Sequence, residues 1–477
     1  MEQPTASFDF GMIGIGVMGS NLLLNMADSG YAVIGFDLKQ ERADALEAAA
    51  PAGTTVKGVV DIVQMVQGLK KPRKIMMLVP AGPPVDSVIE NLLPHLEDGD
   101  IVIDGGNSFF KDTLQRITYL QDKGIHFFGM GVSGGEMGAR FGPSMMPGGD
   151  KDAYQYLKPI LEAVAAKADG VPCVAYMGNN AAGHYVKMVH NGIEYAMMQM
   201  IAEVYDLLKR GGGYTNDQLH QIFLKWDKEQ LQSYLIEITA EVLKTGDEAT
   251  PGNDDYLVDK ILDKAGSKGT GKWTSQVAMD LPVSIPTIDM AVAMRDLSVY
   301  KEQRVQAAAL YKPQTGKITV DEPLLSDLEN ALAFCFTIAY AQGLSQLAKA
   351  SDELAMEIPM PAVIQVWKAG CIIRSALLGN FTQAYQKDPK LPNLLLDAGI
   401  AEVLQNREAS LRKILSLGIN AKIPLAGMGS ALAYYDAYCS ETLPVNLIQA
   451  QRDYFGAHTY QRIDKEGVFH TEWHVGS

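Results

Sequence analysis

The sequence has few cysteines and no long apolar run. Four of its 477 residues are cysteines (Cys173, Cys335, Cys371 and Cys439), with no CxxC pair and no neighbouring histidine. This scatter excludes a disulfide-rich scaffold and a Cys/His metal site, and it indicates free thiols in a reducing compartment. The most apolar stretch, residues 331–341, is much shorter than the ~20 residues that cross a bilayer, so we expect no membrane segment.

Positive charge is also scarce, since 41 Lys and Arg stand against 56 Asp and Glu and the net charge is −15. We expect no nucleic-acid binding, which needs a basic surface to displace counterions. The segment Met1 to Asp9 lacks the basic start and apolar core of a signal peptide. With 47% hydrophobic and 20% charged residues, the chain has the composition of a globular, cytoplasmic protein of two or three domains.

A glycine-rich turn separates two short apolar stretches, residues 8–13 and 31–36. The turn reads Gly14-Ile15-Gly16-Val17-Met18-Gly19 and runs into a helical pattern with one apolar face. This order of strand, turn, helix and strand is typical of dinucleotide binding. Gly14 permits the tight turn, Gly16 lets a pyrophosphate approach the backbone, and Gly19 lets the helix pack on the strand. The alternative is a similar turn in a fold that has lost its cofactor.

The second apolar stretch ends at Asp37. A carboxylate here accepts hydrogen bonds from the ribose hydroxyls of NAD and repels the 2′-phosphate of NADP. Lys39, two residues on, would partly offset that repulsion. The alternative for Asp37 is a solvated side chain at the end of a strand.

Further short apolar strands are predicted at residues 74–79, 101–103, 125–130 and 173–177. Their alternation with helical sequence predicts a Rossmann-type, doubly wound, mostly parallel sheet over residues 1–178. Ligands of such sheets bind beyond the carboxyl ends of the strands. Two polar segments follow strands there, Asp104 to Ser108 and Gly131 to Glu136. Their glycines would allow close approach of a ligand, and Asn107 and Ser133 would hydrogen-bond it.

The chain becomes helical from about residue 179. Helices are predicted over residues 181–209, 217–243, 328–347 and 361–381, within an all-helical domain of residues 179–440 that precedes a tail of residues 441–477. A short internal similarity, Ile222-Phe223-x-x-Trp226 against Val363-Ile364-x-x-Trp367, is compatible with a duplication inside the helical domain or with chance.

One predicted helix, residues 184–195, carries a polar stripe on an otherwise apolar segment. Lys187, His190, Asn191 and Glu194 lie at i, i+3, i+4 and i+7 and therefore share a face, which Tyr195 flanks. A buried lysine can act as a general base and a buried glutamate as an acid. The alternative is a solvated amphipathic face.

Basic residues elsewhere are candidates for binding an anionic ligand. The segment from Lys264 to Lys272 contains Lys268 and Thr270 among glycines, but it lacks the spacing of a phosphate-binding loop of ATPases. It is either a phosphate cradle or a flexible solvated loop. Arg295, Arg452 and His458 are further candidates; each alone would be an ordinary surface residue.

Taken together, these motifs resemble those of the 6-phosphogluconate dehydrogenases of the decarboxylating type, from Gly14 to His458. The resemblance lies in GxGxMG (14–19), DGGNS (104–108), VSGGExGAR (132–140), GPSMMPGG (142–149), KMVHNGIEY (187–195), KGTGKW (268–273) and QAQRDYFGAH (449–458). It implies oxidation of 6-phospho-D-gluconate to ribulose 5-phosphate and CO2 in the pentose phosphate pathway, without a metal.

The resemblance also implies residue roles. Lys187 would be the general base and Glu194 the acid. Substrate would be held by Asn107, Ser133, Gly134, Gly135, His190, Asn191, Tyr195, Lys268, Thr270, Arg295, Arg452 and His458. The cofactor would contact Gly14, Ile15, Gly16, Val17, Met18, Gly19, Asp37, Leu38, Lys39, Val79 and Asn107. A homodimer is implied, in which the tail with Arg452 and His458 reaches the neighbouring subunit.

This chain departs from the family pattern at the cofactor. Where NADP-dependent members carry Asn-Arg-Ser/Thr, it has Asp37-Leu38-Lys39, and Pro80 replaces a frequent lysine. Both changes predict a preference for NAD over NADP. Two alternatives remain: another β-hydroxyacid dehydrogenase, such as one acting on 3-hydroxyisobutyrate, and a dinucleotide-sensing protein without turnover.

Overall fold

The computed structural model describes residues 7–248 and 255–473. Most of the segment Met1 to Asp9, which the sequence predicts is not a signal peptide, lies outside this range. The chain divides into two compact units, Met1–Ala431 and Leu432–Ser477, and each is described by itself. The domain boundaries expected from the sequence stay predictions.

Within the described residues of the first unit, seven strands form one sheet in the order β3-β2-β1-β4-β5-β6-β7. Neighbouring strands are parallel, except for β6 and β7, which are antiparallel. The strands are β1 (Phe10–Ile13), β2 (Val33–Phe36), β3 (Val56–Val59), β4 (Lys74–Met77), β5 (Ile101–Asp104), β6 (His126–Ser133) and β7 (Ser144–Gly148). The predicted doubly wound, mostly parallel sheet is confirmed.

Three details of the strand prediction were wrong. Residues 173–177 form no strand; Val174 makes only an isolated bridge to Met145. The sequence reading also missed β3 and β7. β3 is short and contains Lys57 and Gly58, and β7 contains Pro147.

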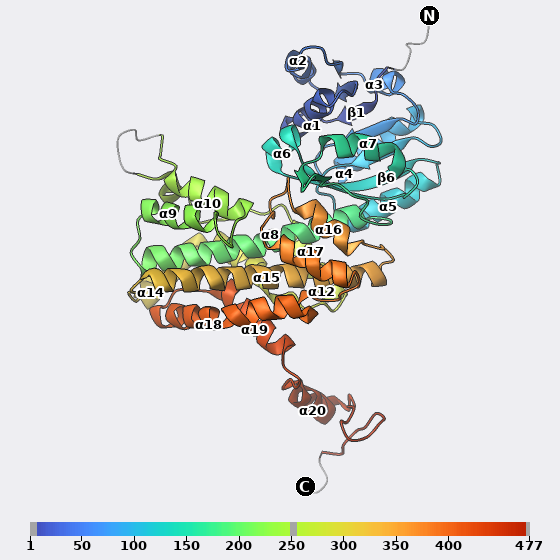
Figure 1. Cartoon of the computed structure of the whole chain (residues 1–477). Coiled ribbons are helices and arrows are strands. Elements are labelled where there is room, and N and C mark those ends of the chain that lie inside the picture. The colour runs from blue at the N-terminus through green and yellow to red at the C-terminus, as the bar shows by residue number, and fades with distance from the viewer. Residues whose placement is uncertain (1–6, 249–254, 474–477) are drawn as a thin grey trace, which may run out of the picture. The chain divides into compact units, whose positions relative to one another are not determined.

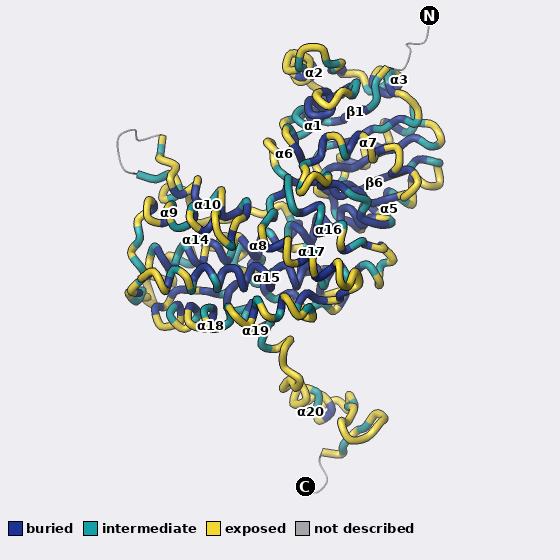
Figure 2. The backbone as a smooth tube through the Cα atoms, viewed as in Figure 1, coloured by how far each residue is buried: buried dark blue, intermediate teal, exposed yellow. Residues whose placement is uncertain are grey.

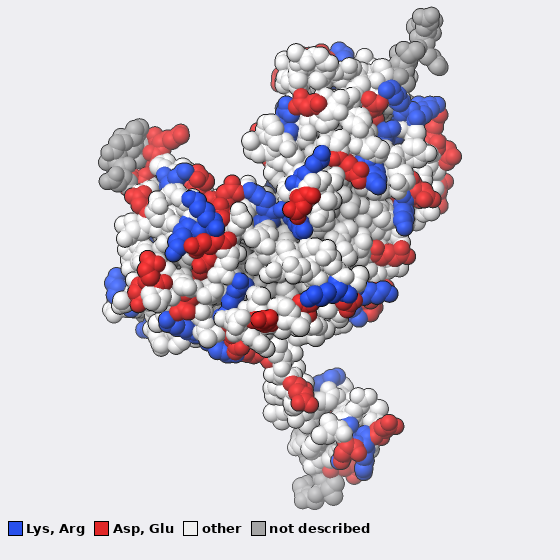
Figure 3. Space-filling model, viewed as in Figure 1, with Lys and Arg blue, Asp and Glu red and all other residues white. Residues whose placement is uncertain are grey.

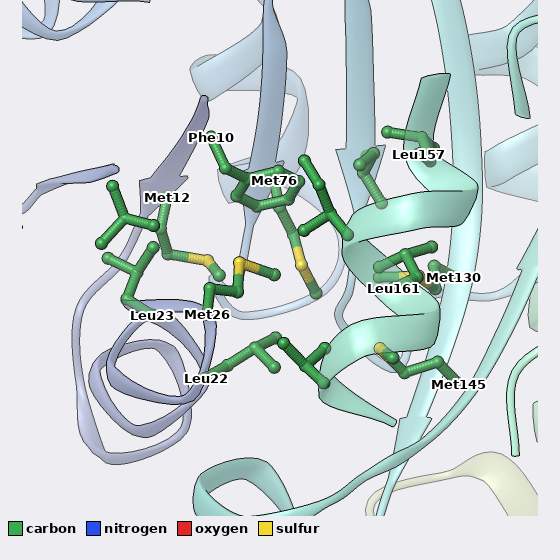
Figure 4. Close-up of a cluster of buried hydrophobic side chains, with 14 of the residues drawn as sticks. Phe10, Met12, Leu22, Leu23, Met26, Met76, Met130, Met145, Leu157 and Leu161 are labelled. Atoms are coloured by element: carbon green, nitrogen blue, oxygen red, sulfur yellow. The ribbon is translucent and has the colours of Figure 1, made fainter. Parts of the chain in front are cut away.

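Helices cover both faces of the sheet (Figure 1). They are α1 (Val17–Asp28), α2 (Gln40–Ala48), α3 (Ile62–Gly68), α4 (Pro83–Leu92), η1 (Leu93–His95), α5 (Phe110–Gln121), α6 (Gly135–Phe141) and α7 (Tyr154–Val164). Because side chains alternate along a strand, β1 contributes to two cores. Phe10 and Met12 join a cluster with α1 and α7, which Figure 4 shows, whereas Ile13 joins a second cluster with α3, α4 and α5.

The turn between β1 and α1 has the geometry that its glycines predict. Gly14 has φ +86°, a conformation that residues with a Cβ rarely adopt. A Cβ on Gly19 would lie 2.1 Å from the carbonyl oxygen of Gly14. The first glycine therefore shapes the turn, and the last brings α1 against the end of β1.

Two long helices, α8 (Ala182–Asp206) and α15 (Glu322–Glu353), form the buried centre of the helical part (Figure 2). α15 has the length and hydropathy of a membrane-spanning helix, but 89% of its most apolar window is buried inside the protein. The surrounding elements are η2 (Leu207–Gly211), α9 (Asn216–Trp226), α10 (Tyr234–Lys244), α11 (Leu257–Lys260), α12 (Thr270–Asp280), α13 (Pro286–Val299), α14 (Lys301–Tyr311), α16 (Met360–Trp367), α17 (Leu378–Lys387), η3 (Leu394–Leu396), α18 (Ala398–Ala421) and α19 (Ala426–Tyr438).

Two of the predicted helices are each divided in two. The helix expected over residues 217–243 is α9 followed by α10, because the Asp227 carboxylate accepts a hydrogen bond from the Ser233 N–H in the turn between them. The helix expected over residues 361–381 is α16 followed by α17, and Gly370 lies between them at φ +67°. Apolar periodicity continues across both breaks, which explains why the sequence reading joined them.

The order of elements repeats within the helical part. α8 is followed by α9 and α10, and α15 is followed by α16 and α17. Trp226 and Trp367, which carry the internal similarity, both end the first short helix and are buried. Ser233 lies just before α10 and Ser375 lies shortly before α17. The two residues form an antiparallel bridge. This order supports the duplication, which stays a prediction.

The contact between α8 and the sheet yields a stability prediction. A Cβ on Gly183 would lie 2.1 Å from the Gly129 carbonyl oxygen and 2.3 Å from that of Met146. Backbone cannot yield as a side chain does, so we expect Gly183→Ala to reduce the free energy of unfolding by ~1–3 kcal/mol, as overpacked cores do. Gly379→Ala in α17 is the matched control, because its Cβ would meet nothing within 4 Å. Equal melting temperatures for the two variants would contradict the prediction.

Candidate active site

A cavity of about 770 Å³ lies at the carboxyl ends of β1 and β4. In a sheet of this order the strand sequence reverses between these two strands, and that switch point is where such sheets bind ligands. The lining includes Gly14, Gly16, Asp37, Leu38, Arg42, Leu78, Val79 and Pro80. Five of the predicted cofactor residues thus meet at one cavity: Gly14, Gly16, Asp37, Leu38 and Val79.

The cavity fits the phosphate and adenosine parts of a dinucleotide. A Cβ on Gly16 would meet nothing within 4 Å, so the backbone there is open. Gly16 is also the N-cap of α1 and makes no side-chain cap, which leaves first-turn N–H groups and the positive end of the helix dipole for an anion. In residues 7–248 and 255–473, no cluster of three His, Cys, Asp or Glu side chains is arranged to hold a metal ion.

The other predicted cofactor residues are placed differently. The side chains of Ile15 and Met18 belong to the core beneath the turn, so only their backbone groups remain for a ligand. Val17 is exposed. Lys39 is exposed and does not line the cavity in the described structure.

Asp37 is paired rather than free. Its carboxylate accepts hydrogen bonds from the Lys39 backbone N–H at 3.2 Å and from Arg42 Nη1 at 3.0 Å. Asp37 is 7% exposed, whereas the Arg42 side chain is 49% exposed. The sequence reading named Lys39 as the positive group near Asp37, but the structure brings in Arg42 on the first turn of α2.

The turn after β5 is shaped by a buried carboxylate. Asp104 accepts hydrogen bonds from the Gly106 N–H at 2.9 Å and the Ser108 hydroxyl at 2.6 Å. The buried Arg116 places Nη1 3.7 Å from the same carboxylate. These contacts hold Asn107 at the exposed tip of the turn, where its amide can reach a ligand.

Two residues of the polar stripe of α8, Lys187 and His190, are buried beside β6, whereas Asn191 and Glu194 are half-buried. Lys187 and His190 are 6% and 0% exposed, and Lys187 Nζ lies 3.4 Å from His190 Nδ1. A Cβ on Gly131 would lie 2.3 Å from Lys187 Cβ. The lack of a side chain at Gly131 therefore lets α8 pack closely on β6. The sequence analysis instead expected the glycines of this segment to allow close approach of a ligand.

His190 connects the stripe to two other segments. Its Nε2 lies 3.3 Å from the hydroxyl of Ser133, the last residue of β6. Its Nδ1 lies 3.0 Å from Asn191 Oδ1, and Asn191 Nδ2 donates to the Thr270 hydroxyl at 3.0 Å. Ser133 Oγ also accepts a hydrogen bond from the Ile372 N–H at 3.3 Å. Four of the predicted substrate residues, Ser133, His190, Asn191 and Thr270, thus form one connected network.

Burial shifts the titration of this cluster. It lowers the pKa of the Lys187 ammonium, against the attraction of the Glu194 carboxylate. It raises the pKa of Glu194, against the opposing charges of Lys187 and Arg295. It also lowers the pKa of His190 well below the usual value, and the Lys187 charge adds to that shift. Both shifts are towards the neutral forms of the Lys187 amine and the Glu194 carboxylic acid, the direction in which a general base and a general acid are tuned.

A basic group lies at the far end of the stripe. The Arg295 guanidinium stacks on the Tyr195 ring at 3.5 Å from its centroid, and Nη1 donates to the Gly266 carbonyl oxygen at 3.4 Å. A Cβ on Gly271 would lie 2.5 Å from the same ring. Tyr195, Arg295 and the start of α12 therefore pack together. Lys268 is exposed in the loop just before α12.

The turn that begins α6 contains the two remaining glycines of the prediction. Gly134 and Gly135 have φ +118° and +63°. A Cβ on Gly134 would lie 2.6 Å from the Gly370 carbonyl oxygen, whereas one on Gly135 would meet nothing within 4 Å. Gly134 is thus required by packing against the segment after α16, and Gly135 leaves its backbone open.

Comparison with known proteins assigns the family. The family model described as the NAD binding domain of 6-phosphogluconate dehydrogenase matches residues 9–178. The model of the 6-phosphogluconate dehydrogenase C-terminal domain matches residues 183–473. The chain belongs to the 6-phosphogluconate dehydrogenase family.

Several relatives are similar over nearly their full length. The decarboxylating 6-phosphogluconate dehydrogenase of Lactococcus lactis strain IL1403 is 50% identical over 98% of this chain and 99% of its own. An NADP-dependent enzyme of this kind from Bacillus subtilis is 49% identical, over 97% and 98%. The solved 6-phosphogluconate dehydrogenase of Plasmodium falciparum, studied with NADP and with 6-phosphogluconate, has 43% identity and a TM-score of 0.93, over 98% of this chain and all of that one.

Family membership confirms the resemblance seen in the sequence motifs, the dehydrogenase class and a nicotinamide dinucleotide as cofactor. The roles of individual residues stay predictions. Basic and acidic side chains are interspersed over the face shown in Figure 3.

The predicted residues Arg452 and His458 lie in the second unit. Arg452 is on α20 (Val445–Gly456) and His458 follows it, and both are exposed. Between them, the buried Asp453 accepts hydrogen bonds from the Thr459 and Thr471 N–H groups, from Trp473 Nε1 and from His470 Nδ1, all at 2.9–3.0 Å. This carboxylate joins the helix to the end of the chain and holds the two candidates in their relative positions.

The sequence did not indicate three groups that contact predicted site residues or their neighbours: Arg42, Arg116 and the Ile372 N–H. Arg42 follows Asp37 by five residues, a distance at which a first-turn side chain can fold back to the preceding strand end. That spacing was a usable signal. The pairing of Arg116 with Asp104 and the Ile372 N–H on Ser133 gave no such signal, because they join segments distant in the sequence.

Proposed function

We propose that this protein oxidises and decarboxylates 6-phospho-D-gluconate to D-ribulose 5-phosphate and CO2, as a step of the pentose phosphate pathway. The observation that carries the proposal is the buried face of α8, where Lys187 and Glu194 have pKa values shifted towards their neutral forms. The near-complete overlap with decarboxylating relatives supports the same reaction. The dinucleotide, when bound, accepts the hydride from C3.

In this proposal the residues of α8 move the protons. Neutral Lys187 takes the proton of the C3 hydroxyl as hydride leaves that carbon. The 3-keto acid then loses its carboxylate as CO2, and the C1–C2 bonding electrons form an enolate whose charge lies on the C3 oxygen. Lys187, now protonated, donates a hydrogen bond to the C3 oxygen and stabilises its negative charge. Glu194 gives its proton to the carbon that carried the carboxylate, which yields the ketose.

The remaining predicted residues would hold the substrate. Ser133, Gly134, Gly135, His190, Asn191 and Asn107 would bind its carboxylate and hydroxyl groups. The phosphate would be bound by Tyr195, Lys268, Thr270 and Arg295, where the stacked guanidinium supplies donors in a fixed plane. His190, kept neutral by burial, can accept a hydrogen bond from a hydroxyl without adding a charge next to Lys187.

The acid–base assignment predicts a bell-shaped pH profile. kcat/KM should rise as Lys187 loses its proton, at a pH below the usual lysine range, and fall as Glu194 loses its own, above the usual glutamate range. We expect Lys187→Ala to reduce kcat by ~10²–10⁴-fold, measured as NADH and CO2 formation from 6-phosphogluconate. Glu194→Gln should lose the alkaline limb, because the amide has no proton to titrate. Full activity of Lys187→Ala would refute the mechanism.

For the cofactor, we propose a preference for NAD over NADP. Asp37 puts a carboxylate in the cavity where the adenosine ribose would lie, and Leu38 and Pro80 bring no positive charge to it. A carboxylate favours free ribose hydroxyls and disfavours a phosphate. The relative from Bacillus subtilis is named as NADP-dependent, so this preference concerns residues of this chain rather than the family as a whole.

Initial rates with each cofactor measure that preference. We expect kcat/KM for NAD to exceed that for NADP by at least about tenfold, or ~1.4 kcal/mol. Asp37→Asn combined with Leu38→Arg should shift the ratio towards NADP, because it removes the repulsive charge and adds a phosphate donor. A tenfold preference of the unchanged enzyme for NADP would contradict the assignment.

We further propose a cytoplasmic homodimer in which the tail of one subunit supplies Arg452 and His458 to the site of the other. The exposed apolar residues of α20 support an interface; they are Val445, Leu447, Ile448, Tyr454 and Phe455. The chain's scattered free cysteines suit a reducing compartment.

Mixing two inactive variants tests the shared site. In a mixed dimer of Lys187→Ala and Arg452→Ala subunits, one site would contain the intact Lys187 together with the intact tail of its neighbour. We expect the mixture, after denaturation and refolding together, to regain activity that neither variant has alone. Each variant refolded separately is the control. No gain on mixing would show that each subunit uses its own tail.

A further inference from the structure

The carboxylate that should exclude NADP has a positive partner inside the same cavity. Both Asp37 and Arg42 line the space at the ends of β1 and β4. Arg42 Nη1 lies 3.0 Å from Asp37 Oδ2, and the other carboxylate oxygen accepts the Lys39 N–H. The guanidinium charge of Arg42 therefore opposes the charge of Asp37, so Asp37 repels a phosphate less strongly than an unpaired carboxylate would.

The pair is asymmetric in its freedom to move. Asp37 is 7% exposed and is held by a backbone donor as well, whereas the Arg42 side chain is 49% exposed. An ion pair with one solvated member contributes little to stability, so the arginine can change partners at low cost. A phosphate dianion carries more charge than a carboxylate and binds the planar guanidinium through two oxygens.

We propose that Arg42 is a specificity-determining residue that changes partners. It pairs with Asp37 when the ribose has free hydroxyls, and it turns to the 2′-phosphate when one is present. The inference rests on the proposed NAD preference. It adds that the chain also uses NADP, as a second cofactor whose 2′-phosphate is bound by Arg42. Lys39 does not take this role, because in the described structure Arg42 lines the cavity and Lys39 does not.

Binding of cofactor fragments tests the proposal without turnover. Calorimetry would compare 2′,5′-ADP, which carries the discriminating phosphate, with 5′-ADP, which lacks it. We expect Arg42→Gln to weaken binding of 2′,5′-ADP at least tenfold and to change that of 5′-ADP less than twofold. Lys39→Gln is the matched control, since it removes a neighbouring charge outside the cavity, and it should change both affinities less than threefold.

A double-mutant cycle separates Arg42 from a general charge effect. Asp37→Asn alone should strengthen 2′,5′-ADP binding at least tenfold, because it removes the repulsion and releases the arginine. Most of that gain should vanish in the Asp37→Asn/Arg42→Gln variant. Additive effects of the two substitutions, or equal weakening of both fragments by Arg42→Gln, would overturn the proposal.

The outcome is distinguishable from failure of the proposed cofactor preference. If the unchanged enzyme prefers NADP but the two substitutions couple through the 2′-phosphate, the preference is wrong and the role of Arg42 stands. If the enzyme prefers NAD and Arg42→Gln leaves the affinity for 2′,5′-ADP unchanged, the preference stands and Arg42 has no such role.

Discussion

The site depends on how closely helix α8 approaches the sheet. At Gly183 the helix backbone touches the carbonyl oxygens of β6 and β7, and at Gly131 the strand leaves room only for the stem of Lys187. This contact puts an ammonium group and an imidazole where water is excluded. Their shifted pKa values follow from that burial. A helix held farther away would leave Lys187 hydrated, with a pKa closer to the ordinary lysine value.

Charge in this molecule acts locally rather than through the net value of −15. The cations that the proposed reaction uses are placed singly: Lys187 in the interior, Arg295 on an aromatic ring, and Arg42 beside a carboxylate. Each is held by close neighbours, so each can meet one group of an anionic ligand in a defined direction. An acidic protein can therefore bind a phosphorylated acid and a dinucleotide without a basic surface.

Local patterns predicted local structure well. The glycine turn after β1 and the continuous helix through residues 184–195 both depend on backbone geometry and on spacing within a few residues, which the sequence displays. The division of two long helices, the antiparallel strand β7 and the bridge of Val174 to Met145 depend instead on a turn hydrogen bond, a glycine with positive φ and pairing between segments. Apolar periodicity alone carries no information about such contacts.

The amino-acid order was sufficient to specify the chemical groups, because a nucleotide turn and a stripe of Lys, His, Asn and Glu are patterns of near neighbours. It could not show that Ser133 and Thr270 join that stripe through His190 and Asn191, or that Asp104 is backed by Arg116. Nor did it identify the partner of Asp37. Those relations arise when strands and helices from separate parts of the chain pack together, because burial and hydrogen-bond geometry are properties of the folded chain. Burial in the folded chain also shifts the pKa values of Lys187, His190 and Glu194.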